Sequence, residues 1–350
     1  MSESIDFTEL TQRVKDALAG AATATGATML PTETAEEIIG IVYERNFMRS
    51  LFPAMPMNRR IMKVPKLSGS VTFHQFSLSD AESGTAATES RHATSEVELE
   101  LKTMMANIPI GNYLVAYGVE GLMSVLRDDI ASRLAFNEQS LFLNSDTETT
   151  YASNINGAYD ATNNVAGVSA SVNDYLLNFD GLRKLASADA VSVSGTFALS
   201  HLREAISNLG VYADNREDLA LIVPRNLEVQ LLGLTELQTV DKYGPAATIL
   251  SGELGRIYGI RVFGTGAIPT DLTYTGVGDA TQGTDVQTLA VLTHIRSPII
   301  GNPTVAERRF SIGFHDEPTK DRFVLIPRQD VAFAVRYPEA TCLLTGIDTI

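Results

Sequence analysis

The residue types that most often perform chemistry are present in this chain, but they are not grouped as a catalytic site requires. The five histidines are dispersed: His74, His92, His201, His294 and His315. The stretch Gly264-Thr265-Gly266 follows an expected strand, as a dinucleotide-binding loop would, but Pro269 occupies the third glycine position. We interpret this stretch as a turn, and a nucleotide-binding enzyme that uses it is one alternative function.

Two further candidates for chemistry have simpler explanations. His315, Asp316 and Glu317 are adjacent and would point in different directions, so we expect a solvated turn rather than a metal site. Cys342 is the one cysteine and lies in an apolar run, which predicts a buried, inert thiol. A single cysteine also excludes a disulfide within the chain and a cysteine-based zinc cage. We therefore predict no catalytic residue, no cofactor and no metal, and we expect that the protein is not an enzyme.

Charged residues between positions 57 and 107 are separated by sign along the chain. The basic residues come first, at positions 59–66. The acidic residues follow at positions 80–100, with Arg91 as the one arginine among them. The resulting candidates for contacts between subunits are Arg59, Arg60, Lys63, Lys66, Glu82, Glu89, Arg91, Glu96, Glu98 and Glu100. One exposed ion pair contributes only about 0–1 kcal/mol, so such pairs matter only when many copies repeat them.

The elements that carry these charges form an expected hairpin. Residues 62–64 and 71–76 have strand-like composition, and residues 96–102 alternate strictly, with Val97, Leu99 and Leu101 on one face. The polar stretch 77–95 between the strands is too long for an ordinary loop, which indicates a functional or mobile segment. We expect a projecting hairpin over 57–107 whose apolar face is covered by an adjacent subunit.

A long helix is expected from Gly118 to Asn144. Its apolar residues recur at helical spacing, with Asp128, Arg133 and Glu138 off that stripe. The rest of the chain mixes helices and strands without a regular alternation, which indicates an α+β fold. Helices are expected over 196–209 and 227–234, and strands over 219–223, 257–263, 289–294, 309–314, 323–327, 331–337 and 341–344.

Composition excludes several classes of protein. The chain has 350 residues, 44% of them hydrophobic, and its 27 basic and 42 acidic residues give a net charge of −15. A chain with no excess of cations is poorly suited to wrapping nucleic acid by neutralising phosphates. The acidic first residues and the lack of a long apolar run predict a soluble protein made in the cytoplasm, with no membrane partner.

The order of these features resembles the major capsid proteins of tailed phages, the HK-ninety-seven-like fold family, from about Met29 to the C-terminus. Residues 29–52 look like the family's N-terminal arm, 61–105 its extended loop, and 120–144 its spine helix. Residues 221–234 and 252–269 resemble its axial domain, and the C-terminal strands its returning sheet. The division that the resemblance implies is an N-terminal arm (1–56), an extended hairpin loop (57–107), a peripheral domain with the spine helix (108–180), an axial domain (181–288) and returning strands (289–350).

The resemblance implies a coat protein that self-assembles into hexamers and pentamers of an icosahedral virion shell around double-stranded DNA, without sequence-specific binding. Its implied partners are further copies of itself, a portal, and a scaffolding or decoration protein. Only 28 residues precede the matching region, so we expect no built-in scaffold. The second interpretation is an encapsulin-type compartment, which the long hairpin disfavours. Some members of the family join this loop to a neighbour by a Lys-Asn bond; because Lys63 and Lys66 lie near the hairpin base, we expect a shell without such cross-links.

Overall fold

The computed structural model describes residues 46–67, 71–75, 79, 82, 89–91, 93–112, 122–148, 154–156, 175–186, 190–233, 256–278 and 286–349. The expected arm before residue 46, most of the loop at 77–93, the first residues of the expected long helix and the stretch 252–255 lie outside these ranges.

A six-stranded sheet forms one layer of the body. Its strands follow the order β1 (Ala54–Met57), β11 (Pro298–Pro303), β13 (Arg322–Val335) and β12 (Ser311–Glu317), and β4 (Lys102–Met105) and β5 (Ile108–Gly111) also pair with β13. Strand β13 is continuous from Arg322 to Val335, where two strands, 323–327 and 331–337, were expected. Pro327 has no N–H to donate, but it lies at the break between β4 and β5, where a strand partner for that N–H is not required. Its carbonyl points to the same break and accepts a hydrogen bond from the N–H of Ala106.

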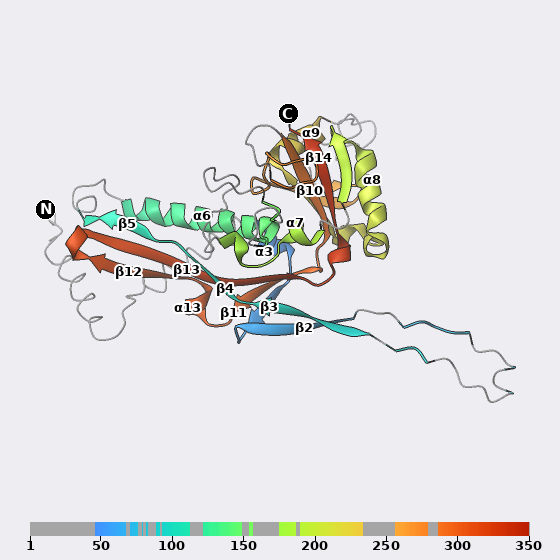
Figure 1. The fold of residues 1–350 in the computed structure, drawn as a ribbon, viewed down its shortest axis with the longest axis horizontal. Helices are drawn as coiled ribbons and strands as arrows, with labels where there is room; N and C mark the ends of the chain where they lie inside the picture. The colour runs from blue at the N-terminus through green and yellow to red at the C-terminus, as the bar shows by residue number, and fades with distance from the viewer. Residues whose placement is uncertain are drawn as a thin grey trace, which may run out of the picture.

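The long helix α6 (Leu122–Asn144) lies along this sheet (Figure 1). Its 23 residues span about 35 Å at 1.5 Å per residue, which confirms the spine helix over the described part. Ile130 and Ala135 pack against Phe310 and Ile312 of the sheet layer. Nearer its C-terminus, the ring of Phe142 stacks on Phe333 of β13 with 5.1 Å between centroids. The short helix α3 (Phe47–Leu51) packs against the same end of α6, where Met48 is fully buried.

A second six-stranded sheet forms the other part of the body, beyond one end of α6 (Figure 1). Its order is β6 (Ala190–Gly195), β14 (Thr341–Asp348), β10 (Gln287–His294), β7 (Leu219–Pro224), β9 (Ile260–Thr265) and β8 (Arg256–Ile257). Helices α8 (Leu199–Asn208) and α9 (Arg225–Leu232) cover one face, and α7 (Leu182–Leu185) lies toward α6. Cys342 is completely buried in β14, as the sequence predicted.

The remaining elements are short. The four-residue helix α13 (Ala306–Arg309) follows β11, and 3-10 turns occur at Tyr175–Leu177, Gly210–Ala213, Arg216–Asp218, Pro318–Lys320 and Pro338–Ala340.

Two expectations about turns were wrong: His315–Glu317 belong to strand β12 rather than a turn, and Gly264 lies within β9. No helix follows Gly264 within residues 266–278, so the arrangement of a dinucleotide-binding loop is missing from this part of the chain. None of the helices described is long and apolar enough to span a membrane.

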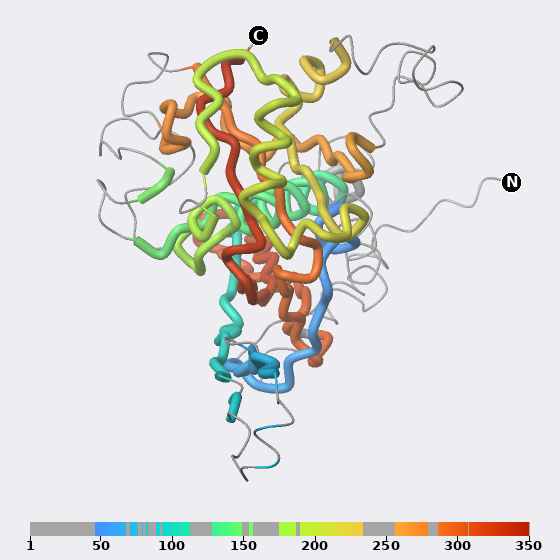
Figure 2. Tube along the Cα trace, turned by 90° about the vertical axis from the view of Figure 1, so that its right-hand side faces the viewer, coloured from blue at the N-terminus to red at the C-terminus, as the bar shows by residue number. Residues whose placement is uncertain are grey.

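Strands β2 (Ile61–Leu67) and β3 (Thr94–Glu100) form a separate two-stranded ribbon. Figures 1 and 2 show this ribbon leaving the body, and the described residues 71–75 continue beyond β2 in the same direction. Residues 71–75 are not in a strand, so the strand expected at 71–76 was wrong for the described residues.

Candidate subunit interface

The root of the ribbon is anchored by its own chain. Val64 of β2 and Leu99 of β3 pack in one apolar cluster with Met57, Ile299 and Ala332. Leu99 is fully buried, while Val97 and Leu101 on the same face are half-buried, which confirms the alternation expected for β3. The expectation that the hairpin cannot bury its apolar face within one subunit was therefore wrong at its root, because residues distant in sequence cover it there.

Several of the predicted contact residues pair with each other across the ribbon. Antiparallel register places Ile61 opposite Glu100 and Pro65 opposite Glu96. The same register places Lys63 opposite Glu98, and Lys63 forms its ion pair with Glu96, the diagonal neighbour on the same face. Arg60 contacts Glu100 at 3.0 Å. Glu100 also lies 2.7 Å from Lys102. Nearer the loop, Arg91 pairs with Glu89 at 2.9 Å, and both side chains are exposed.

These pairs shift the titration of two groups. The hydrogen bond to the Glu96 carboxylate raises the pKa of the Lys63 ammonium group above its ordinary value. The hydrogen bond from Lys102, helped by the charges of Lys102 and Arg60, lowers the pKa of the Glu100 carboxyl. Both groups are therefore held in their charged forms.

The other predicted contact residues divide into two kinds. Lys66 donates a hydrogen bond of 3.2 Å to the carbonyl of Arg336, and its Nζ lies 6.0 Å from the ring centroid of Tyr337. Arg59, Glu82 and Glu98 are exposed and form no ion pair with any residue that the structure describes. The role of all ten residues between subunits stays a prediction, since one chain is present.

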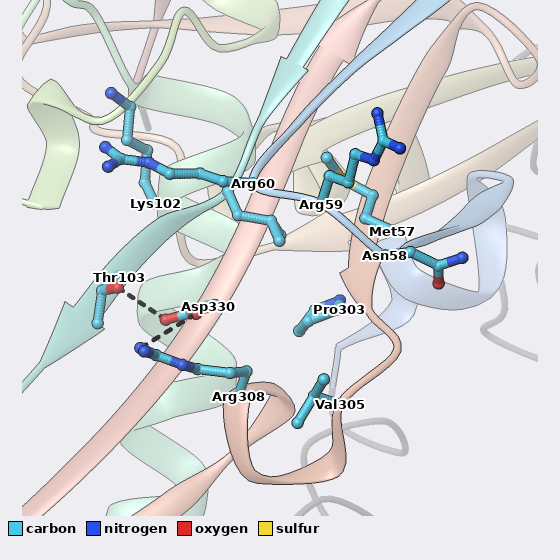
Figure 3. A pocket seen from close by; sticks show the side chains of 11 residues that line it. Met57, Asn58, Arg59, Arg60, Lys102, Thr103, Pro303, Val305, Arg308 and Asp330 are labelled. Carbon is cyan, nitrogen blue, oxygen red and sulfur yellow. Dashed lines mark hydrogen bonds and ion pairs between the residues drawn. The ribbon is translucent and has the colours of Figure 1, made fainter.

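An open pocket of about 430 Å³ lies where the ribbon joins the body (Figure 3). Four of its lining side chains are basic, namely Arg59, Arg60, Lys102 and Arg308, and one is acidic. That acid, Asp330, accepts a 2.7 Å hydrogen bond from Thr103 and lies 3.8 Å from Arg308. Apolar side chains of Met57, Leu101, Pro303 and Val305 complete the lining. Sequence reasoning named Arg59 and Arg60 but missed this pocket, because Arg308 comes from a distant part of the chain.

A buried polar network ties the segment before the ribbon to the body. Arg49 of α3 forms an ion pair with Glu138 of α6, and both side chains are almost inaccessible. Asn46 and Gln329 donate to the same carboxylate, and Arg49 also donates to Asn302 at 2.8 Å. Glu138, which falls off the apolar stripe of the helix, is buried because α3 and two strands of the sheet enclose this part of α6.

A second buried network follows the end of α6. Arg183 of α7 is fully buried and donates to Asn144 at 2.9 Å, to Asn156 at 3.2 Å and to the carbonyl of Gly276 at 2.8 Å. Burial lowers the pKa of this guanidinium to about 10, so it remains charged at neutral pH. Asp146 is also buried and accepts from Lys184 at 3.0 Å. These bonds fix the turn after α6. The side chains of Arg183 and Asp146 are buried and therefore not accessible to a substrate. No group of histidine, cysteine, aspartate and glutamate side chains is placed to hold a metal among the described residues.

Solved structures have a similar overall fold. The capsid of a native GTA particle aligns with a TM-score of 0.58 at 13% identity, covering 87% of this chain and 90% of that one. A structure of Microbacterium phage Oxtober96 gives 0.56 at 12% identity, covering 85% and 90%. A satellite phage P4 procapsid with the size determination (Sid) protein gives 0.55 at 16%, covering 99% and 98%. The predicted α+β, HK-ninety-seven-like capsid fold is therefore confirmed.

Sequence comparison identifies the family. A model described as the phage capsid family matches residues 26–223, more than half of the chain, so the chain belongs to the phage capsid family. A major capsid protein of Klebsiella oxytoca phage phiKO2 is 26% identical over 136 residues. That alignment covers 39% of this chain and only 30% of the length of that relative.

Proposed function

We propose that this chain is the major capsid protein of a tailed phage, which assembles into the hexamers and pentamers of an icosahedral shell. The observation that carries the proposal is the ribbon of β2 and β3, on a chain of the phage capsid family. Within the described residues these strands pair only with each other, so each has an unpaired outer edge. A two-stranded ribbon is marginally stable alone in water, and a neighbouring subunit would cover it.

The exposed side chains of the hairpin support the same role. Phe73 is 95% exposed on the outgoing segment, an unusual position for a large apolar ring unless another surface covers it. Arg59, Glu82 and Glu98 are charged, exposed and without an ion pair in the described part of the chain. In this proposal the ten charged residues named from the sequence contribute to contacts between subunits, and the five segments act as arm, hairpin, peripheral domain, axial domain and returning strands.

The remaining roles follow from that of a coat protein. The shell encloses double-stranded DNA without sequence-specific contacts, and the acidic chain limits adhesion of the genome to the wall. Assembly takes place in the host cytoplasm with a portal and, where used, scaffolding or decoration proteins. The chain acts as a structural protein of the virion and catalyses no reaction.

Electron microscopy of the purified protein tests the proposal. We expect closed, regular shells, and particles isolated from infected cells should protect DNA from nuclease. Shells that enclose a protein cargo and no DNA would favour the compartment alternative. A protein that stays monomeric under all assembly conditions would overturn the proposal.

A further inference from the structure

The pocket at the root of the ribbon carries more positive charge than its own chain neutralises. Four basic side chains line the pocket, and three of them pair with two carboxylates. Asp330 lies beside Arg308, and Glu100 is shared by Arg60 and Lys102. Arg59 has neither an ion pair nor a hydrogen bond within the described residues, and Figure 3 shows its guanidinium pointing away from that of Arg60. This local excess of cations stands out in a chain with a net charge of −15.

Such a site suits an acidic segment with small apolar side chains. Exposed cations attract carboxylates, while Met57, Pro303 and Val305 offer apolar contact beside them. Val305 is 58% exposed, so part of this apolar lining is open to solvent.

The far end of the hairpin has the matching composition. Residues 77–90 contain Asp80, Glu82 and Glu89, no lysine or arginine, and several alanines. The structure describes Glu82 and Glu89, and both are exposed. Glu89 pairs with Arg91, which leaves Glu82 as the described acid of this segment without an ion pair.

The same hairpin therefore has an excess of positive charge at its root and negative charge at its end. The described residues 71–75 and 89–91 continue beyond β2 and β3 away from the root, so this part of the hairpin leads away from the pocket of its own subunit (Figures 1 and 2). In a ring of identical subunits, two different patches of the chain meet at each contact, one from each copy. We propose that the pocket formed by Arg59, Arg60, Lys102 and Arg308 receives the acidic end of the hairpin, residues 77–90, of a second copy of this chain. This inference rests on the proposed assembly.

A charge-swap experiment tests this pairing, with assembly of the unaltered protein as its reference. Arg59→Glu and Glu82→Arg each place like charges across the contact and should each lower the yield of shells about tenfold. The double variant restores opposite charges across the contact and should recover a yield within about twofold of the unaltered protein. Arg216→Glu makes the same charge change on an exposed arginine of the second-sheet part and should leave the yield unchanged.

Two outcomes would overturn the inference while leaving the proposed function intact: normal shells from Arg59→Glu, and a double variant no better than the single ones. Normal Arg59→Glu shells that hold less DNA would in addition assign the pocket to phosphate. Failure of the unaltered protein to form shells would instead reject the proposed function.

A covalent probe gives a second readout. Because Cys342 is the one cysteine and is buried, the background of oxidation is low. Mild oxidation of shells carrying Arg59→Cys and Glu82→Cys together should give a ladder of disulfide-linked oligomers, whereas either change alone should not. Monomers only from the double-cysteine shells would contradict the proposed contact.

Discussion

The Nε atom of Arg49 lies 2.7 Å from Oε2 of Glu138, and this buried ion pair joins helices α3 and α6 through two residues that are 89 positions apart in the chain. Gln329 of β13 donates to the other carboxylate oxygen at 3.0 Å, and Asn302 of β11 accepts from Arg49. The pair therefore fixes the segment that leads into β1 and the ribbon against both the spine helix and the large sheet.

Removing one member of this pair should destabilise the subunit strongly. Arg49→Met leaves a buried carboxylate without its cation, and we expect the free energy of unfolding to fall by about 3–5 kcal/mol. Urea unfolding followed by far-UV circular dichroism measures this change, since the chain has no tryptophan for fluorescence. Arg133→Met is the matched control, because Arg133 is exposed and lies 3.8 Å from Asp129; it should change stability by less than about 0.5 kcal/mol. Equal effects of the two changes would show that the buried pair does not hold the subunit together.

Local patterns in the sequence predicted the elements that depend on neighbouring residues. The alternation around Leu99 correctly predicts β3, and the apolar repeat predicts most of α6. Burial of Glu138 could not be predicted in this way, because the groups that surround it come from positions 46, 49 and 329.

In the candidate interface, too, local sequence patterns were predictable and contacts between distant residues were not. The separation of charge in the hairpin was visible in sequence, but the pairing of Lys63 with Glu96 follows from the strand register. The pocket depends on Arg308, which no local pattern connects to Arg59. Contacts between distant segments are thus the part that the sequence alone did not provide.

Acid should weaken the root of the ribbon through Glu100. Its pKa in the folded protein lies below its ordinary value of 4.5, because Lys102 and Arg60 favour the carboxylate. Its contribution to stability is therefore present above about pH 4.5 and is lost as the pH falls through the folded-state pKa. Glu100→Gln should unfold more readily than the unaltered protein at pH 7, and this difference should shrink as the pH falls below 4.5.

Shortening the hairpin should separate folding from assembly. Leu67 and Thr94 are the last paired residues of the ribbon, so replacing residues 68–93 with Asn-Gly closes it with a two-residue turn. The apolar cluster around Leu99 remains complete, and we expect the free energy of unfolding to change by less than about 0.5 kcal/mol. Shell formation should fail, which sedimentation and electron microscopy would detect. A shortened chain that assembles normally would show that the hairpin makes no necessary contact between subunits.

The shell should lack covalent cross-links. Attack by a lysine requires its neutral form, but the Glu96 carboxylate raises the pKa of Lys63, and Lys66 is engaged with the carbonyl of Arg336. Asn302 lies in strand β11, where it accepts a hydrogen bond from Arg49. Boiled, detergent-treated particles should run as one band near 37.8 kDa. A ladder of covalent oligomers without added cysteines would contradict this expectation.

A cryo-electron microscopy reconstruction of the assembled particles tests the central claim most directly. The account predicts a closed shell of hexamers and pentamers in which the ribbon of β2 and β3 from each subunit lies across an adjacent copy, with Arg59 of that copy near the hairpin end. A particle in which each ribbon folds back onto its own subunit, or a preparation with no closed shells, would contradict it.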